Sequence, residues 1–134
     1  MKLTRRKWFI SLVLFFFLVG LIFAMFYLKS VADYKKAIKD TSFIGINIST
    51  ISDGSYIGEY DVDFIYAKVK VTVQSGKITD IEILEHKNER GEPAEAIVGQ
   101  IVREQEINVD AISGATNSSI VIKKAVENAL IEKK

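Results

Sequence analysis

A run of 21 residues without a charged side chain, from Trp8 to Leu28, constrains this chain more than any other feature. As an α-helix rising about 1.5 Å per residue, it would span about 31 Å, close to the hydrocarbon thickness of a bilayer. A cleaved signal peptide normally has an apolar core of only about 7–15 residues. The run therefore predicts a retained membrane-spanning helix, while a small-x-small triplet at residues 30–32 leaves cleavage after Ala32 open.

Charged side chains are distributed unevenly around this run. The first 29 residues hold five basic side chains and no acidic one, which leaves 13 basic and 17 acidic residues downstream. This asymmetry predicts a single-pass protein of the cell membrane, with a cytoplasmic N-terminus and an extracytoplasmic C-terminal domain. A mildly acidic domain lacks the basic patch that phosphates require, so nucleic-acid binding is excluded. The absence of cysteine excludes disulfides, zinc-thiolate sites and iron–sulfur clusters.

The pattern divides the chain into three parts. Residues 1–29 form the cytoplasmic flank and the membrane helix, residues 30–42 a polar stalk that can continue the helix, and residues 43–134 one compact domain. The domain begins with predicted strands at 56–63, 68–74 and 77–84. Val69, Val71 and Val73 alternate on one strand face, and the Ser75-Gly76 turn joins the last two strands in a hairpin.

Two helical patterns follow the strands. Apolar residues recur at helical spacing over 94–105, just after Pro93, and again over 118–132. The last helix is expected to place four polar residues on its solvent side: Lys123, Lys124, Glu127 and Asn128. Strands followed by helices predict an α+β fold, in which a small antiparallel sheet packs with two or three helices behind the transmembrane helix.

The segment between these two helices carries a motif that points to chemistry. Residues 108–119 read NVDAISGATNSS and contain the pattern Asp-x-x-Ser-Gly-Ala-Thr. This pattern resembles the attachment motif of the FMN-binding domain family, in which a flavin is bound through its phosphate to a threonine hydroxyl. The matching residues are Asp110, Ser113, Gly114, Ala115 and Thr116.

The resemblance extends from about residue 53 to the C-terminus. Further matching segments follow in the family's order: Asp53-Gly-Ser-Tyr56 with Gly58, Val71–Ile78, Glu85-His86 and Val121–Leu130. The family includes the flavin subunits of sodium-pumping NADH:quinone oxidoreductase and of the related ferredoxin-oxidising membrane complex. This chain is most similar to short single-domain forms, because its loop after His86 lacks the Thr-Pro-Gly run of the complex subunits.

The resemblance implies FMN attached covalently to Thr116 through a phosphoester. A separate magnesium-dependent flavin transferase would supply the FMN from FAD. The chain would then relay electrons between a membrane or extracellular donor and acceptor, at or outside the cytoplasmic membrane. This role is that of an electron-transfer flavoprotein or a component of an oxidoreductase system, so we assign no catalytic residue and no protein metal site.

Physical chemistry supports the same residues. A phosphate ester at Thr116 would lie just before the last helix, where unpaired N–H groups and the helix dipole stabilise an anion. Gly114 allows a positive φ and the close approach of a bulky group, and Ala115 adds no obstacle. Asp110 would repel a phosphate, so it is assigned to the modification step or to hydrogen bonds of the loop. Asn117 and Ser118 complete the predicted site, and each is also a candidate N-cap.

The other candidate residues give weaker indications of a function. His86 is expected at the surface, as are the carboxylates of residues 82–95, and Tyr56 is a candidate neighbour of the flavin ring. One alternative function is a flavin-free anchored binding or regulatory module, of the kind seen in PepSY-like proteins, which would leave the Asp110–Thr116 motif unexplained. Another is an enzyme that uses the flavin to reduce a small substrate, although no substrate-pocket signature accompanies it.

Overall fold

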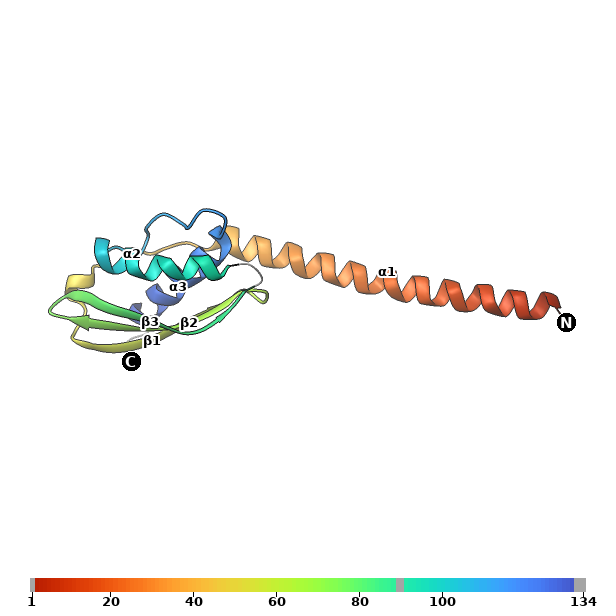
Figure 1. The fold of residues 1–134 in the computed structure, drawn as a ribbon, viewed down its shortest axis with the longest axis horizontal. Coiled ribbons are helices and arrows are strands. Elements are labelled where there is room, and N and C mark those ends of the chain that lie inside the picture. Colours follow the sequence, from red (N-terminus) through yellow and green to blue (C-terminus); the bar gives the residue numbers. More distant parts are fainter. Residues whose placement is uncertain (1, 89–90, 132–134) are drawn as a thin grey trace. The chain divides into compact units, whose positions relative to one another are not determined.

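The computed structural model describes residues 2–88 and 91–131. The chain divides into two compact units, Met1–Lys36 and Ala37–Lys134. Helix α1, Lys2–Asp40, forms the first unit and enters the second with its last residues (Figure 1). The predicted continuation of the helix into the polar stalk is therefore confirmed as far as Asp40.

Helix α1 is long and apolar enough, over Thr4–Asp40, to cross a membrane. Its large apolar side chains are exposed, with Trp8 at 71% and Phe16 at 65% of the accessible surface. A core helix of a soluble domain would bury these side chains against other elements, so this role is excluded. The length and composition are those of a single membrane span or of a signal sequence.

The second unit contains one antiparallel sheet with the strand order β1-β2-β3. The strands are β1 (Gly54–Asp61), β2 (Tyr66–Gln74) and β3 (Lys77–Lys87). Ser75 and Gly76 join β2 to β3, and both have positive φ values, 52° and 72°, as a type I′ hairpin turn requires. Val69, Val71 and Val73 are at most 1% exposed on the inner face, so the predicted hairpin and its alternation are confirmed.

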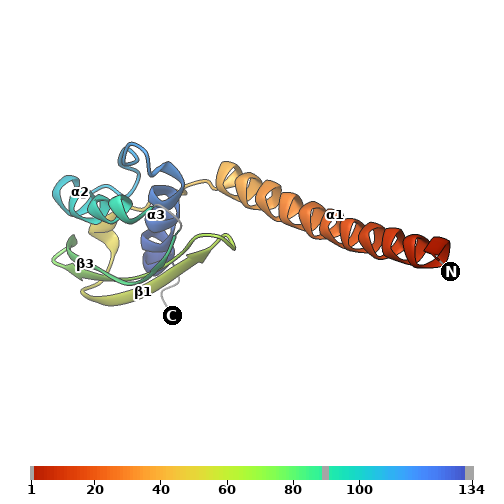
Figure 2. The ribbon, with the colours of Figure 1, turned by 45° about the vertical axis from the view of Figure 1, so that its right-hand side comes forward.

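Helices cover the inner face of the sheet, as Figure 2 shows. They are α2 (Ile97–Glu104), preceded by the 3₁₀ turn η2 (Glu92–Ala96), and α3 (Thr116–Ile131); a further 3₁₀ turn, η1, spans Ile48–Thr50. Helix α3 packs on β1 and β2, and α2 packs on β3. The predicted α+β class is confirmed, with η2 forming the first turn of the helix expected over 94–105. The predicted end of the last helix, Glu132, lies outside the described residues.

Strand β3 does not keep a strict alternation. Its pairing with β2 shifts between Lys68 and Val69 and again between Thr72 and Val73. Each shift is a β-bulge, because it places one extra residue on β3, Leu84 or Thr79, between successive pairs. The extra residue Thr79 lies between Ile78 and Ile81, so both of these side chains point inward although they are three residues apart.

The contact between β1 and α3 depends on Gly58. A Cβ atom at this position would overlap the backbone nitrogen of Ala129 and the carbonyl oxygen of Ala125. The missing side chain lets the strand and the helix backbone approach closely, and alanines on the facing side of α3 keep the same space free.

We expect Gly58→Ala to destabilise the second unit by about 1–3 kcal/mol, because backbone atoms on both sides cannot move aside easily. For a domain of this size, the loss corresponds to a fall of roughly 4–8 °C in melting temperature per kcal/mol. Thermal unfolding of the full chain in detergent micelles measures it. Gly99→Ala in α2 is the matched control, because a Cβ there meets only the end of the Arg103 side chain at 3.6 Å. The control should be neutral or stabilising.

Candidate functional site

The segment between α2 and α3, residues 106–115, is called the entry loop here because it leads into α3. A tight turn ends it: the amide of Ala115 donates to the carbonyl of Ile112 at 3.0 Å. Gly114 has a φ of +79°, a value that residues other than glycine rarely adopt. A Cβ atom at this position would meet nothing within 4 Å. Glycine is therefore required by the turn, and the space beside it is open.

Ser119 braces this turn from within α3. Its hydroxyl donates to the carbonyl of Ala115 at 2.8 Å and accepts from the amide of Ile112 at 3.0 Å, and the residue is fully buried. Ser119 lies outside the Asp110–Thr116 motif. The available signal was its position three residues before Ile122, where the apolar stripe of the helix would otherwise continue.

Helix α3 begins at Thr116, two residues before its predicted start. Asn117 and Ser118 therefore lie inside its first turn, and the prediction that either would be the N-cap is wrong. Thr116 is exposed, whereas Ser118 is 3% exposed. The hydroxyl-bearing residues that follow the turn thus differ sharply in their exposure to solvent.

The other predicted residues of the entry loop lie near Thr116 because they are close to it in the sequence. Asp110, Ser113 and Gly114 are exposed, and Ala115 is 6% exposed at the junction with α3. A short apolar anchor, Ile107 and Val109, ties the loop to the core.

Lys123 holds the middle of the entry loop. Its ammonium donates to the carbonyl of Val109 at 2.8 Å and to Oδ1 of Asn108 at 3.2 Å, and the residue is only 5% exposed. Burial lowers the pKa of Lys123, and the charge of Asp110 opposes this effect. The prediction that Lys123 and Glu127 face solvent is wrong: Glu127 is 1% exposed, because further segments of the chain cover this face of α3.

His86 is also buried, contrary to the prediction that it lies at the surface. The extra residue Leu84 in β3 shifts the inward position from residue 85 to residue 86, which faces the core opposite Ala67. The His86 side chain is 2% exposed, and its Nδ1 lies 3.0 Å from Oε1 of Glu95. Its Nε2 is buried and has no hydrogen-bond partner in the structure, over residues 2–88 and 91–131.

Gly91, just before η2, lies against the start of α3. Asn88 Oδ1 accepts from the amide of Gly91 at 2.8 Å, and a Cβ at Gly91 would overlap the side chain of Ser118. The η2 turn contacts α3 as well. The buried imidazole therefore belongs to the part of the core that supports the first turns of α3.

Tyr56 lies on a different part of the domain. Its hydroxyl donates to the carbonyl of Ser52 at 2.6 Å. The next inward residue of β1, Gly58, packs between Ala125 and Ala129 of α3. This contact lies about 13 Å or more along the helix from Thr116 at 1.5 Å per residue. The contacts of Tyr56 thus do not link it to the entry loop, and its role beside a flavin ring stays a prediction.

Comparison with known proteins identifies the domain. The family profile of the FMN-binding domain matches residues 65–131, half of the chain, including β2, β3, both helices and the whole entry loop. The chain belongs to the FMN-binding domain family. No curated protein and no solved structure matches it significantly. The family match is narrower than the resemblance expected from residue 53, because it begins after β1.

Membership of the FMN-binding domain family indicates FMN as the ligand. The match ends at Ile131, the last described residue of α3, so it includes Thr116 together with the residues that brace the turn before it.

We expect Ser119→Ala to destabilise the domain by about 1–3 kcal/mol, because it leaves the buried amide of Ile112 without its acceptor. Thermal unfolding of the full chain in detergent measures the change. Ser113→Ala, at an exposed position of the same turn, should change the stability by less than about 0.5 kcal/mol. Equal melting temperatures for the two variants would contradict the assignment of Ser119 as the brace.

Proposed function

We propose that the chain is a membrane-anchored, extracytoplasmic flavoprotein with FMN attached covalently to Thr116, and that it relays electrons at or outside the cytoplasmic membrane. The observation that carries this proposal is the family match over the entry loop and α3, together with the exposed position of Thr116 at the first residue of α3. The apolar helix α1 supports the anchoring.

The hydroxyl groups near the turn favour Thr116 as the attachment residue. Ser118 and Ser119 are buried, and Ser119 already uses its hydroxyl in two hydrogen bonds. Ser113 is exposed but lies within the turn, before the helix begins. Thr116 is an exposed residue at the start of α3, where amide N–H groups and the dipole favour an anion.

The surroundings of Thr116 also fit a phosphate ester. The first turn of α3 contains no acidic side chain, so no carboxylate neutralises the positive end of the helix. The open space beside Gly114 leaves room for a bulky group or a modifying enzyme. Asp110, exposed in the same loop, is the candidate for a contact with the transferase or its metal ion.

The modification requires a simple exchange of bonds. Thr116 Oγ1 forms a bond to the phosphorus on the flavin side of FAD, the pyrophosphate bond breaks, and AMP leaves. The proton of the threonine hydroxyl passes to a base of the transferase or to solvent. A magnesium-dependent flavin transferase of the host would catalyse this exchange with FAD as the donor.

Covalent attachment has a physical advantage outside the cell. A noncovalently bound flavin that dissociates there is lost by dilution, whereas a phosphoester retains it at any binding strength. The bound FMN would supply one- and two-electron chemistry, and the protein would fix its position. Helix α1, as a membrane anchor, would raise the effective concentration of the domain toward donors and acceptors in the membrane.

Intact mass of the full chain tests the attachment, after coexpression with and without a flavin transferase. We expect a gain equal to FMN less one water, together with flavin fluorescence after denaturing electrophoresis. Thr116→Ala should abolish both signals, and Thr116→Ser should retain them because it keeps a hydroxyl. Thr79→Ala, an exposed threonine on β3, is the matched control. No gain with an active transferase would refute the proposal and favour the flavin-free binding module.

Single cysteines test the topology, since the chain contains none. We expect Ser55→Cys, on the exposed side of β1, to react with a membrane-impermeant maleimide on intact cells. Thr4→Cys, before the apolar run, should react only after lysis. The mass of the labelled Ser55→Cys protein also reports whether α1 is retained. Labelling of Thr4→Cys alone on intact cells would reverse the proposed orientation.

A further inference from the structure

Charged side chains on one face of α3 are buried, which is costly unless hydrogen-bonding partners surround them. Lys123 and Glu127 are 5% and 1% exposed. Thr116 lies on the same face, because residues seven and eleven positions apart in a helix point in nearly the same direction. The partners of the two buried charges come from two segments far apart in the sequence.

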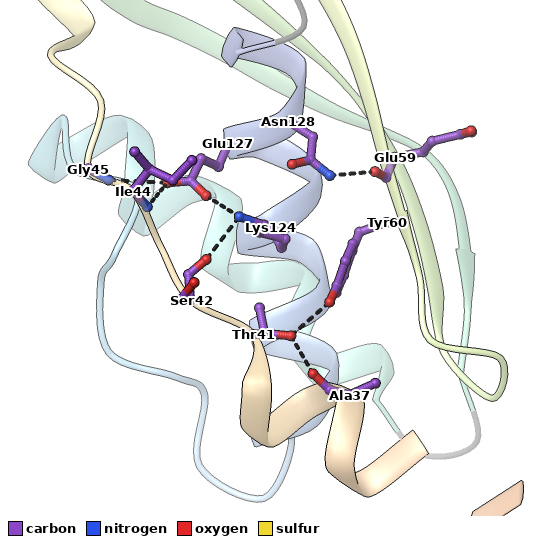
Figure 3. Close-up of polar contacts among 10 residues, drawn as sticks. All are labelled: Ala37, Thr41, Ser42, Ile44, Gly45, Glu59, Tyr60, Lys124, Glu127 and Asn128. Atoms are coloured by element: carbon purple, nitrogen blue, oxygen red, sulfur yellow. Dashed lines mark hydrogen bonds and ion pairs between the residues drawn. The ribbon is translucent and has the colours of Figure 1, made fainter. Parts of the chain in front are cut away.

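The first segment is residues 41–46, called the strap, which follows the end of α1. Glu127 Oε1 accepts from the amides of Ile44 at 2.7 Å and Gly45 at 3.3 Å. Its other oxygen pairs with Lys124 at 2.6 Å, and Lys124 donates to the carbonyl of Ser42 at 2.9 Å. Figure 3 shows the strap passing on one side of α3 and β1 on the other.

Thr41 fixes the start of the strap. Its hydroxyl donates to the carbonyl of Ala37, 2.7 Å away in the last turns of α1, and bonds to the hydroxyl of Tyr60 at 2.8 Å (Figure 3). The strap is thus tied to β1 at one end through two side-chain hydroxyls, and to α3 along its length through its own backbone groups.

The second segment is the entry loop, which Lys123 holds through Asn108 and Val109. Phe43 of the strap connects the two segments. Its ring centre lies 5.0 Å from Nζ of Lys123 and 5.8 Å from Nζ of Lys124, within the range of a cation–π interaction. The Phe43 ring therefore covers the ammonium group of Lys123, which donates the hydrogen bonds that hold the entry loop.

We propose that Phe43 and Lys123 are positioning residues for the modification of Thr116: the docked strap keeps Lys123 in place, and Lys123 keeps the entry loop in the conformation that presents Thr116. This inference rests on the proposed covalent attachment. An aromatic cover excludes water from the ammonium, so its bonds to the loop compete less with solvent. Because the strap follows directly from α1, the same segment that leaves the apolar helix also orders the loop before the modified residue.

Hydrogen exchange of the unmodified full chain in detergent micelles tests the coupling without any flavin. The amides of Ile112 and Ala115 are the reporters, because the first donates to the Ser119 hydroxyl of α3 and the second to the carbonyl of Ile112 within the entry loop. We expect Lys123→Met to accelerate their exchange about tenfold or more. Phe43→Ala should accelerate it about threefold or more. Core amides of β2 should keep their wild-type rates in both variants.

A double variant and a control separate coupling from a general loss of structure. If Phe43 acts through Lys123, the variant with both substitutions should exchange no faster than Lys123→Met alone. Ile44→Ala is the matched control, because this neighbouring side chain is 73% exposed and its backbone amide stays bound to Glu127. Additive effects, or unchanged loop exchange in Phe43→Ala, would overturn the proposal.

The rate of FMN incorporation gives the functional readout. With saturating transferase and FAD, Phe43→Ala and Lys123→Met should be modified several-fold more slowly than the wild type, and Ile44→Ala at the wild-type rate. Equal rates in all four proteins would overturn the positioning role. If the wild type takes up no FMN, the covalent attachment itself fails, whereas the exchange rates still decide whether the strap holds the loop.

Discussion

The burial of α3 on nearly all sides is the constraint on which the second unit depends. The sheet covers one side of the helix through Gly58, η2 and the segment before it cover another, and the strap and entry loop cover the third. A short helix enclosed in this way gains its stability from packing rather than from intrinsic propensity. Its first residue, Thr116, remains exposed, so the proposed attachment residue lies where the enclosed helix reaches solvent.

The burial of α3 also explains why its charged residues have so many hydrogen-bonding partners. A buried carboxylate or ammonium without partners would destabilise the fold by several kcal/mol. Glu127 is satisfied by backbone amides and Lys124, and Lys123 by a backbone carbonyl and an amide oxygen. Apart from Lys124, these partners lie in the strap and the entry loop, so the charges of α3 order parts of the chain that have no hydrogen-bonding ladder of their own.

The β-bulge at Leu84 in β3 affects the part of the core near the start of α3. The extra residue Leu84 turns His86 inward, where Glu95 contacts one ring nitrogen and the other is left without a partner in the described structure. Bulges are known to redirect side chains next to functional sites. Here the bulge turns the imidazole of His86 toward the core, where Glu95 of η2 contacts it, whereas a regular strand would have directed it to solvent.

The sequence by itself determined the apolar helix, the hairpin, the α+β class and the family, because these follow from local patterns: an uncharged run, a period of two, a period of 3.6 and a short contiguous motif. It also located the entry loop through Asp110–Thr116. The tertiary structure alone decided the burial of Lys123, Glu127 and His86 and the brace at Ser119. The reason is physical: helical periodicity describes one apolar face, but the strap that covers the polar face lies some 80 residues away in the sequence. A bulge likewise depends on the partner strand, so no single strand reveals which way its later side chains point.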